Sequence, residues 1–329
     1  MVSHYRLISN ITLIVTKIHF LILKQFPKAL GYYTQLLTYT KSAVTRNYSE
    51  KSINGILDYV SSDKAKDQQT LDLELMEKFY SVTKNTLAEM KNERLSVKTN
   101  LKLAKLWLDR MEYERLDATI KELRQSCQSA DGTDDQSKGS LLLEISALEI
   151  QMYSQTNDTK KLREIYNQTS TITSAISHPR VMGIIKECGG KMHMNEKNWE
   201  KAQTDFFESF RCYDEAGSIQ RIQVLKYLVL AHMLMNSEID PFDSQETKPY
   251  KENAEIEPMT QLVNAYQNRE VHEAEKIIRK HHKIIMEDNF ISHFIDDVMR
   301  ALRITYLTDL IKPYSILDLK FISTVSNYL

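Results

Sequence analysis

The chain has 329 residues but only 8 glycines and 6 prolines, whereas average usage would give about 23 and about 16. Sandwiches and barrels need frequent Gly and Pro turns, and phosphate-binding loops need closely spaced glycines, so these classes are excluded. The formal net charge is −1, so no global field attracts nucleic acid or an anionic membrane. A mostly helical chain is predicted.

The N-terminal segment, residues 1–25, has an atypical composition. Residues 7–23 are mostly apolar but contain Asn10, Lys17 and His19. A bilayer span needs about 20 apolar residues, and a central Lys costs about 2.5–3.5 kcal/mol on insertion scales. No small-residue cleavage site follows, as a secretory signal would require. We expect a buried or partner-facing helix; the alternatives are an anchor or signal, and a start site foreign to the fold.

The next stretch, residues 24–51, is basic. Residues 1–51 contain seven Lys and Arg against one acid, a charge of +6 that leaves −7 for the remainder. An apolar stripe that includes Tyr33 and Leu37 predicts a helix face turned inward, with the cations outward. The basic side chains of the candidate partner-binding site are Lys28, Lys41, Arg46 and Lys51. They either form a docking surface for an acidic protein patch or a polyphosphate, or simply a solvated basic face.

A helical hairpin of the tetratricopeptide type is predicted around residues 190–210. Gly190, Trp199, Ala202, Phe206 and Phe210 stand at the small, aromatic and apolar positions of such a repeat. A small residue on the first helix lets the second approach closely, with Trp199 and Ala202 between the two. Phe206 and Phe210 are expected to face the next repeat.

Weaker copies of this pattern occur on both sides. Their residues are Ala104, Trp107, Tyr113, Leu116 and Ile120; Ile150, Tyr153, Leu162 and Tyr166; and Leu262, Ala274 and Ile278. With Leu30 and Leu75 as earlier equivalents, the spacing is irregular and near 40 residues. Degenerate hairpins with inserted loops, stacked into a right-handed superhelix, are therefore predicted for residues 26–235.

The C-terminal part is expected to be a different module. Three prolines within residues 236–258 mark the transition, and a last long amphipathic helix is predicted from after Glu287 to about Ile311, where Pro313 stops it. Residues 236–313 are assigned to a second helical subdomain. Residues 314–329 open with short apolar alternation and a helix start at Ser323, as if beginning a further element.

The sequence gives no sign of catalysis. It has no His-x-His pair, no P-loop and no nucleophile elbow. His281 and His282 are expected about 100° apart on one helix, where they cannot easily share a metal. Cys188, His193 and Cys212 could suggest zinc, but packing is the preferred interpretation. The three cysteines are widely spaced and odd in number, which favours reduced thiols. We therefore predict that the chain is not an enzyme and holds no metal.

Five segments carry a resemblance to a known family. They are LLTYTKSAVTRNYSEKSINGILDYVS (36–61), ECGGKMHM (187–194), AQTDFFESFRCYDEAGS (202–218), LKYLVLAHML (225–234) and PFDSQETKPYK (241–251). Over about residues 26–322 the chain resembles subunit 2 of the COP-nine signalosome, a PCI-domain family. Subunits of the proteasome lid and of translation initiation factor three share the architecture but match these segments less well.

The resemblance implies an all-α fold with a helical-repeat arm, a PCI helical bundle and a winged helix. It implies a non-catalytic scaffold in the cytoplasm and nucleus, which docks cullin–RING ligases through the cullin C-terminal domain and the RING protein. Another, metalloprotease subunit then removes the ubiquitin-like protein Nedd8. The PCI domain is expected to bind other signalosome subunits, and inositol hexakisphosphate is associated with the cullin contact. A nucleic-acid or transcription-associated adaptor, or a membrane-tethered one, is the alternative.

Three departures from the family pattern are expected to matter. The acidic N-terminal extension and first hairpin of the family are replaced by apolar residues 1–23, so only basic residues from Lys28 onward have matched context. Residues 61–70 form a longer loop than the family pattern. The chain stops at Leu329, just inside the expected winged helix. It is therefore expected either to bind cullin yet assemble poorly or to be an incomplete gene model.

Overall fold

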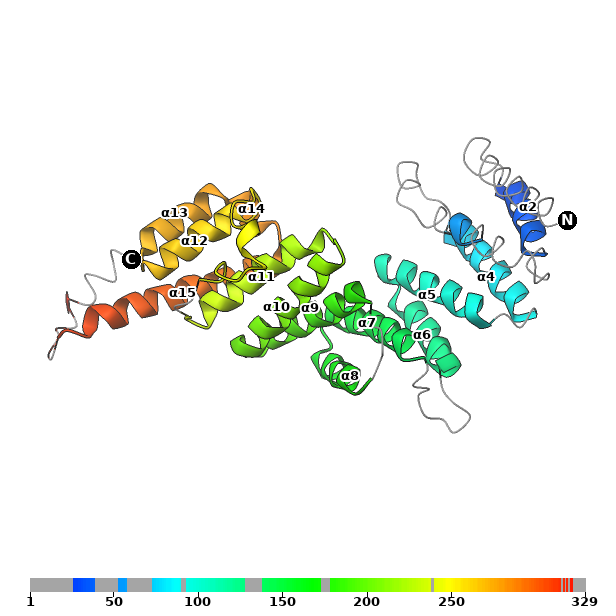
Figure 1. The fold of residues 1–329 in the computed structure, drawn as a ribbon, viewed down its shortest axis with the longest axis horizontal. Helices are drawn as coiled ribbons and strands as arrows, with labels where there is room; N and C mark the ends of the chain where they lie inside the picture. The colour runs from blue at the N-terminus through cyan, green and yellow to red at the C-terminus, as the bar shows by residue number, and fades with distance from the viewer. Residues whose placement is uncertain are drawn as a thin grey trace. The chain divides into compact units, whose positions relative to one another are not determined.

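The computed structural model describes residues 26–38, 53–57, 73–89, 93–127, 138–172, 178–237 and 240–314, with 316, 318, 320 and 321. Within these ranges every regular element is a helix and no strand occurs, which confirms the all-α class (Figure 1). The chain divides into two compact units, Met1–Asp135 and Gln136–Leu329. The predicted features at residues 1–23, 61–70 and 323–329 lie outside the described residues.

The first unit is a series of helices packed on their neighbours in the chain. They are α2 (Phe26–Thr38), α4 (Leu73–Glu89), α5 (Glu93–Asp109) and α6 (Tyr113–Cys127), and residues 53–57 are also helical. α2 packs on α4, α4 on α5, and α5 on α6. Tyr33 of α2 is fully buried against Phe79 of α4, and its hydroxyl lies 2.6 Å from the Thr83 hydroxyl. The inward face predicted for α2 is therefore confirmed at Tyr33 and Leu37.

The second unit contains the remaining helices. They are α7 (Gly139–Gln155), α8 (Thr159–Thr171), α9 (Pro179–Asn195), α10 (Trp199–Glu215), α11 (Gln220–Leu234), the 3-10 turn η4 (Lys248–Tyr250), α12 (Glu257–Gln267), α13 (Val271–Lys280), α14 (His282–Met286) and α15 (Asn289–Ile311). Consecutive helices pair as α7 with α8, α9 with α10, and α12 with α13. α9 also packs on α7, and α11 on α15. The predicted hairpins at α5–α6, α7–α8, α9–α10 and α12–α13 are thus confirmed.

Most of the hairpin turns use one left-handed residue. Met111, Asn157, Lys197 and Arg269 have φ between 57° and 62° at the turns after α5, α7, α9 and α12, and Gly217 has φ 61° after α10. The next amide then reaches back five residues, as in Asn198 N–H to the His193 carbonyl at 2.9 Å. This is the Schellman arrangement, which satisfies the last carbonyls of a helix.

The α9–α10 pair is the closest approach that the sequence predicts. A Cβ added at Gly190 would lie 2.6 Å from the ring of Phe206, so only glycine allows this contact. Phe206 is fully buried, and its ring also contacts Tyr227 of α11, as expected for a residue that faces the next repeat. Trp199 packs edge-to-face on Phe294 of α15, a contact that the repeat pattern does not predict.

The C-terminal helices share a core with the hairpins before them. One cluster of buried side chains runs from Met194 to Leu302, on both sides of residue 235. The domain limits proposed at 235 and 313 remain predictions. α15 begins after the Asp288 cap and ends at Ile311, as predicted. The expectation that His281 and His282 share a helix is wrong, because α13 ends at Lys280 and α14 starts at His282.

Candidate partner-binding surface

The predicted basic surface can be followed at one of its four residues. Lys28 is exposed on α2, on the side away from the buried Ala29 and Tyr33. Lys41, Arg46 and Lys51 lie outside the described residues, so no geometry joins them to Lys28. Their assembly into one surface stays a prediction.

Helix α5 contributes a row of lysines in the same unit. Lys98, Lys102 and Lys105 are spaced at i, i+4 and i+7, so they share one helix face. Lys98 and Lys105 are exposed, and Lys102 is half-buried. Between Glu93 and Asp109, the first and last residues of the helix, no acid occurs. The face is therefore positive along the middle of α5.

The lysine row reaches the segment that follows the predicted site. The Lys102 ammonium donates a hydrogen bond of 3.3 Å to the carbonyl of Asn54, three residues beyond Lys51. α5 thus supports residues 53–57 through Lys102. We define the arm lysines as Lys28, Lys98, Lys102 and Lys105.

Two other described cations of this unit, Lys84 and Arg115, are already paired. Lys84 of α4 binds both carboxylate oxygens of Glu122, at 2.8 and 2.6 Å. Arg115 pairs with Glu77 and lies over the ring of Trp107. Among the described residues no acid pairs with Lys98 or Lys105. An unpaired ammonium has three donors for a partner's carboxylate or phosphate oxygens.

The sequence contains a signal for the α5 lysines that the net charge of the region does not reveal. Four cations (Arg94, Lys98, Lys102 and Lys105) occur between two acids sixteen residues apart, at helical spacing. The overall charge of this region is diluted by acids on the neighbouring helices. The positive face becomes visible only when the residues are grouped by the helical period of 3.6 residues.

A buried polar network ties α8, α9 and α10 together in the second unit. Tyr166 donates to both carboxylate oxygens of Asp205, each at 2.8 Å, and Lys186 donates to the same carboxylate at 3.1 Å. Burial alone would lower the pKa of Lys186, but Glu208 and Asp205 hold it above its usual range. A Cβ at Gly189 would lie 2.4 Å from the Tyr166 ring, so glycine permits this contact. These polar groups use their hydrogen-bonding capacity on one another, so the network stabilises the packing of α8, α9 and α10.

A second network lies between α9, α10 and α11. Tyr213 donates to Glu187 at 2.8 Å, and Lys191 pairs with the other oxygen of that carboxylate at 2.7 Å. The Lys191 ammonium also lies 4.8 Å from the ring centroid of Tyr227 and 5.7 Å from that of Phe290. Buried charge is compensated here by a carboxylate and two aromatic faces.

The cysteines and histidine considered for zinc are packed separately. Cys188 is buried, and loss of solvation raises the pKa of its thiol to about 12, whereas Cys212 is only partly buried. In the described part of the chain no group of three or more His, Cys, Asp or Glu side chains is placed to hold a metal ion. None of the described helices is both long enough and apolar enough to cross a bilayer.

Three curated proteins that are similar to this chain in sequence all carry the same name. The chain is 54% identical to COP9 signalosome complex subunit 2 of Emericella nidulans over 301 residues, covering 92% of this chain and 59% of the relative. It is 54% identical to that of Drosophila melanogaster, covering 90% and 65%, and 50% identical to that of Dictyostelium discoideum, covering 95% and 68%. The chain thus spans about three fifths to two thirds of these relatives. No protein-family model matches it.

Proposed function

Because the chain belongs to the family of COP9 signalosome complex subunit 2, we propose that it is a non-catalytic scaffold that docks cullin–RING ubiquitin ligases onto the signalosome. A separate metalloprotease subunit removes Nedd8 from the cullin. The first unit grips the ligase at the cullin C-terminal domain and the RING protein. The helical bundle near the C-terminus joins other signalosome subunits, in the cytoplasm and nucleus.

One observation supports the docking role most strongly: α5 presents a row of lysines on one helix face, with no acid between Glu93 and Asp109. Lys28, Lys98 and Lys105 are exposed and lack an acidic partner within the described residues. Like charges repel one another on a helix, so such a row costs stability unless a partner neutralises it. An acidic protein surface is a fitting partner, since complementary charge raises the association rate and fixes the register.

The predicted residues Lys41, Arg46 and Lys51 extend the same surface in this proposal. Lys102 holds the segment that follows Lys51 through the carbonyl of Asn54. The basic stretch and the α5 row would then act together on one partner. A polyphosphate such as inositol hexakisphosphate suits the same chemistry, because free ammonium groups bind phosphate oxygens.

Charge reversal tests this proposal. Replacing Lys98 and Lys105 by Glu, or Lys41 and Arg46 by Glu, should weaken capture of a purified cullin–RING complex by roughly tenfold or more, since each pair of exposed charges contributes a few tenths to 1 kcal/mol and reversal adds repulsion. Far-UV circular dichroism should be unchanged, because these α5 side chains are exposed.

A matched control separates the effect of the docking site from the effect of net charge. Lys160 of α8 and Lys201 of α10 are exposed lysines without an acidic partner among the described residues. Their double replacement by Glu changes the charge equally but should leave capture unaltered. Equal capture by the α5 variant, the Lys41 and Arg46 variant and the wild type would refute the docking surface.

A further inference from the structure

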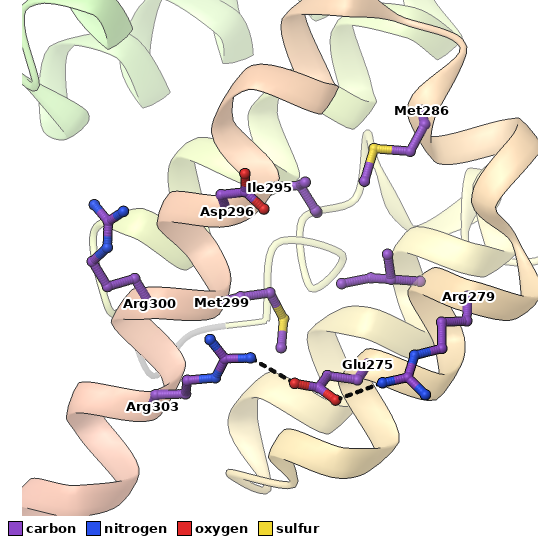
Figure 2. Close-up of a pocket in the computed structure, with 9 residues that line it drawn as sticks. Glu275, Arg279, Met286, Ile295, Asp296, Met299, Arg300 and Arg303 are labelled. Atoms are coloured by element: carbon purple, nitrogen blue, oxygen red, sulfur yellow. Dashed lines mark hydrogen bonds and ion pairs between the residues drawn. The ribbon is translucent and has the colours of Figure 1, made fainter. Parts of the chain in front are cut away.

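A groove lies in the second unit, between α13, α14 and α15. Its volume is about 400 Å³, within the range of sites that hold a ligand or side chain. Its apolar lining comes from Ile278, Met286, Ile295 and Met299 (Figure 2). Methionine side chains adapt their shape to what they contact, so this floor can accept an apolar side chain of a partner.

Three arginines border the groove. In Figure 2, Glu275 stands between Arg279 of α13 and Arg303 of α15. One Glu275 oxygen accepts from Arg279 at 3.1 Å and the other from Arg303 at 2.6 Å. One carboxylate therefore serves two guanidinium groups, which leaves a net charge of +1 at this end. Among the described residues, Arg300 pairs only with Asp297, three residues earlier on the same helix, at 3.0 Å.

The guanidinium groups keep most of their donors free. Arg279 and Arg303 each use one terminal nitrogen on Glu275, whereas an arginine has five N–H donors. The side chains of Arg279 and Arg300 are 80% and 71% exposed. Exposed pairs of this kind contribute little to stability. Their remaining N–H groups can therefore bind a further carboxylate, with bidentate geometry, at small cost.

The charges are graded along the groove. Asp296 lies one turn before Arg300 on α15, and Arg303 lies nearly one turn beyond it. Asp296 is thus at one end, and Arg279 and Arg303, with Glu275 between them, are toward the other, with the Met and Ile floor alongside. Lys280 and Lys283, both exposed, add positive charge after Arg279. Glu275, which lies between Arg279 and Arg303, would repel a dianionic phosphate more strongly than a singly charged carboxylate.

We propose that this groove binds an acidic peptide segment of a partner protein, with an apolar side chain on the Met286–Met299 floor and Asp or Glu side chains on Arg279, Arg300 and Arg303. The surface belongs to the second unit and is separate from the docking role of the first. In this proposal the apolar contact gives most of the affinity, and the arginines select peptides with acidic residues beside the apolar one.

The test uses a display library of short random peptides selected on the immobilised full chain. Enriched sequences should combine a large apolar residue with at least one Asp or Glu. The best peptide, made synthetically, should bind the double variant Arg279→Glu, Arg300→Glu about tenfold or more weakly than the wild type. Met286→Gln should also weaken it, by removing apolar contact while nearly keeping side-chain volume.

Controls make each outcome decisive. The double variant Lys160→Glu, Lys201→Glu carries the same charge change elsewhere and should bind the peptide like the wild type. Circular dichroism checks that the groove variants stay folded. No enrichment, enrichment without acidic residues, or equal binding by the arginine variant would each overturn the proposal. Displacement of the peptide by inorganic phosphate beyond the effect of chloride at equal ionic strength would do so too, since it would indicate a phosphate site.

Discussion

The contact between Gly190 and Phe206 makes a quantitative prediction about the helix packing. In Gly190→Ala the new methyl group would lie 2.6 Å from the Phe206 ring, well inside van der Waals contact. The ring cannot retreat easily, because it is fully buried with Tyr227 and Phe290 at centroid distances of 5.6 and 6.4 Å. Overpacking of this kind costs about 1–3 kcal/mol, and we take the upper end.

Helix propensity opposes that cost. Ala is favoured over Gly in a helix interior by about 1 kcal/mol, so the net loss of unfolding free energy should be about 2 kcal/mol. Urea denaturation can measure it through the fluorescence of Trp199 in a Trp107→Phe background, since Trp199 belongs to the second unit and packs on Phe294. The midpoint should fall with the slope unchanged.

Two comparisons establish the cause. Gly31→Ala in α2, where nothing lies within 4 Å of the added methyl group, should instead stabilise the first unit by up to about 1 kcal/mol, read by circular dichroism. Adding Phe206→Leu to Gly190→Ala should cost less than the sum of the two single changes, because the smaller side chain makes room. A neutral or stabilising Gly190→Ala would refute the close-approach argument.

Three further predictions concern turns, burial and pH. Met111→Gly should raise the unfolding free energy by about 1 kcal/mol and Gly217→Ala should lower it by about as much, because both positions have φ 61°. Urea denaturation measures both changes, and variants as stable as the wild type would contradict this reasoning. Burial lowers the pKa of His232, with Asp240 opposing, so its contribution to stability is present above the ordinary value of 6.5 and is lost as pH falls below it; melting curves between about pH 7.5 and 5.5 should show a smaller loss in His232→Gln, and an unchanged loss would exclude this origin. Cys188, with its thiol pKa raised to about 12, should resist alkylation at about pH 8 until urea unfolds the protein; fast labelling of this residue by mass spectrometry would show that it is accessible.

Contacts between neighbouring helices could be predicted from the sequence pattern, whereas contacts between distant parts of the chain could not. The small and aromatic positions Gly190, Ala202 and Phe206 lie on two adjacent helices, so spacing alone predicts that they meet. The contact of Trp199 with Phe294 joins residues far apart in the chain, and no periodicity encodes it. The groove likewise requires Glu275 and Arg303 to meet across α13 and α15.

The candidate site was predictable in part for a similar reason. Lys28 was expected to face outward and is exposed. The lysine row of α5 does not show in the net charge along the chain, because charge repeated at the helical period is a property of one helix face. The break at His281 was missed because neither glycine nor proline marks it, and its φ of −107° and ψ of 24° lie within the range of ordinary residues.

Binding to a cullin–RING ligase tests the central claim most directly. A purified complex of a cullin C-terminal domain with its RING protein would be titrated against the full chain at low and at near-physiological salt. The proposal predicts saturable binding that weakens as salt rises, because the Debye length falls from about 30 Å at 0.01 M to about 8 Å at 0.15 M, and weaker binding by the Lys98→Glu, Lys105→Glu variant at each salt. No binding at low salt, or binding indifferent to both salt and these lysines, would contradict it.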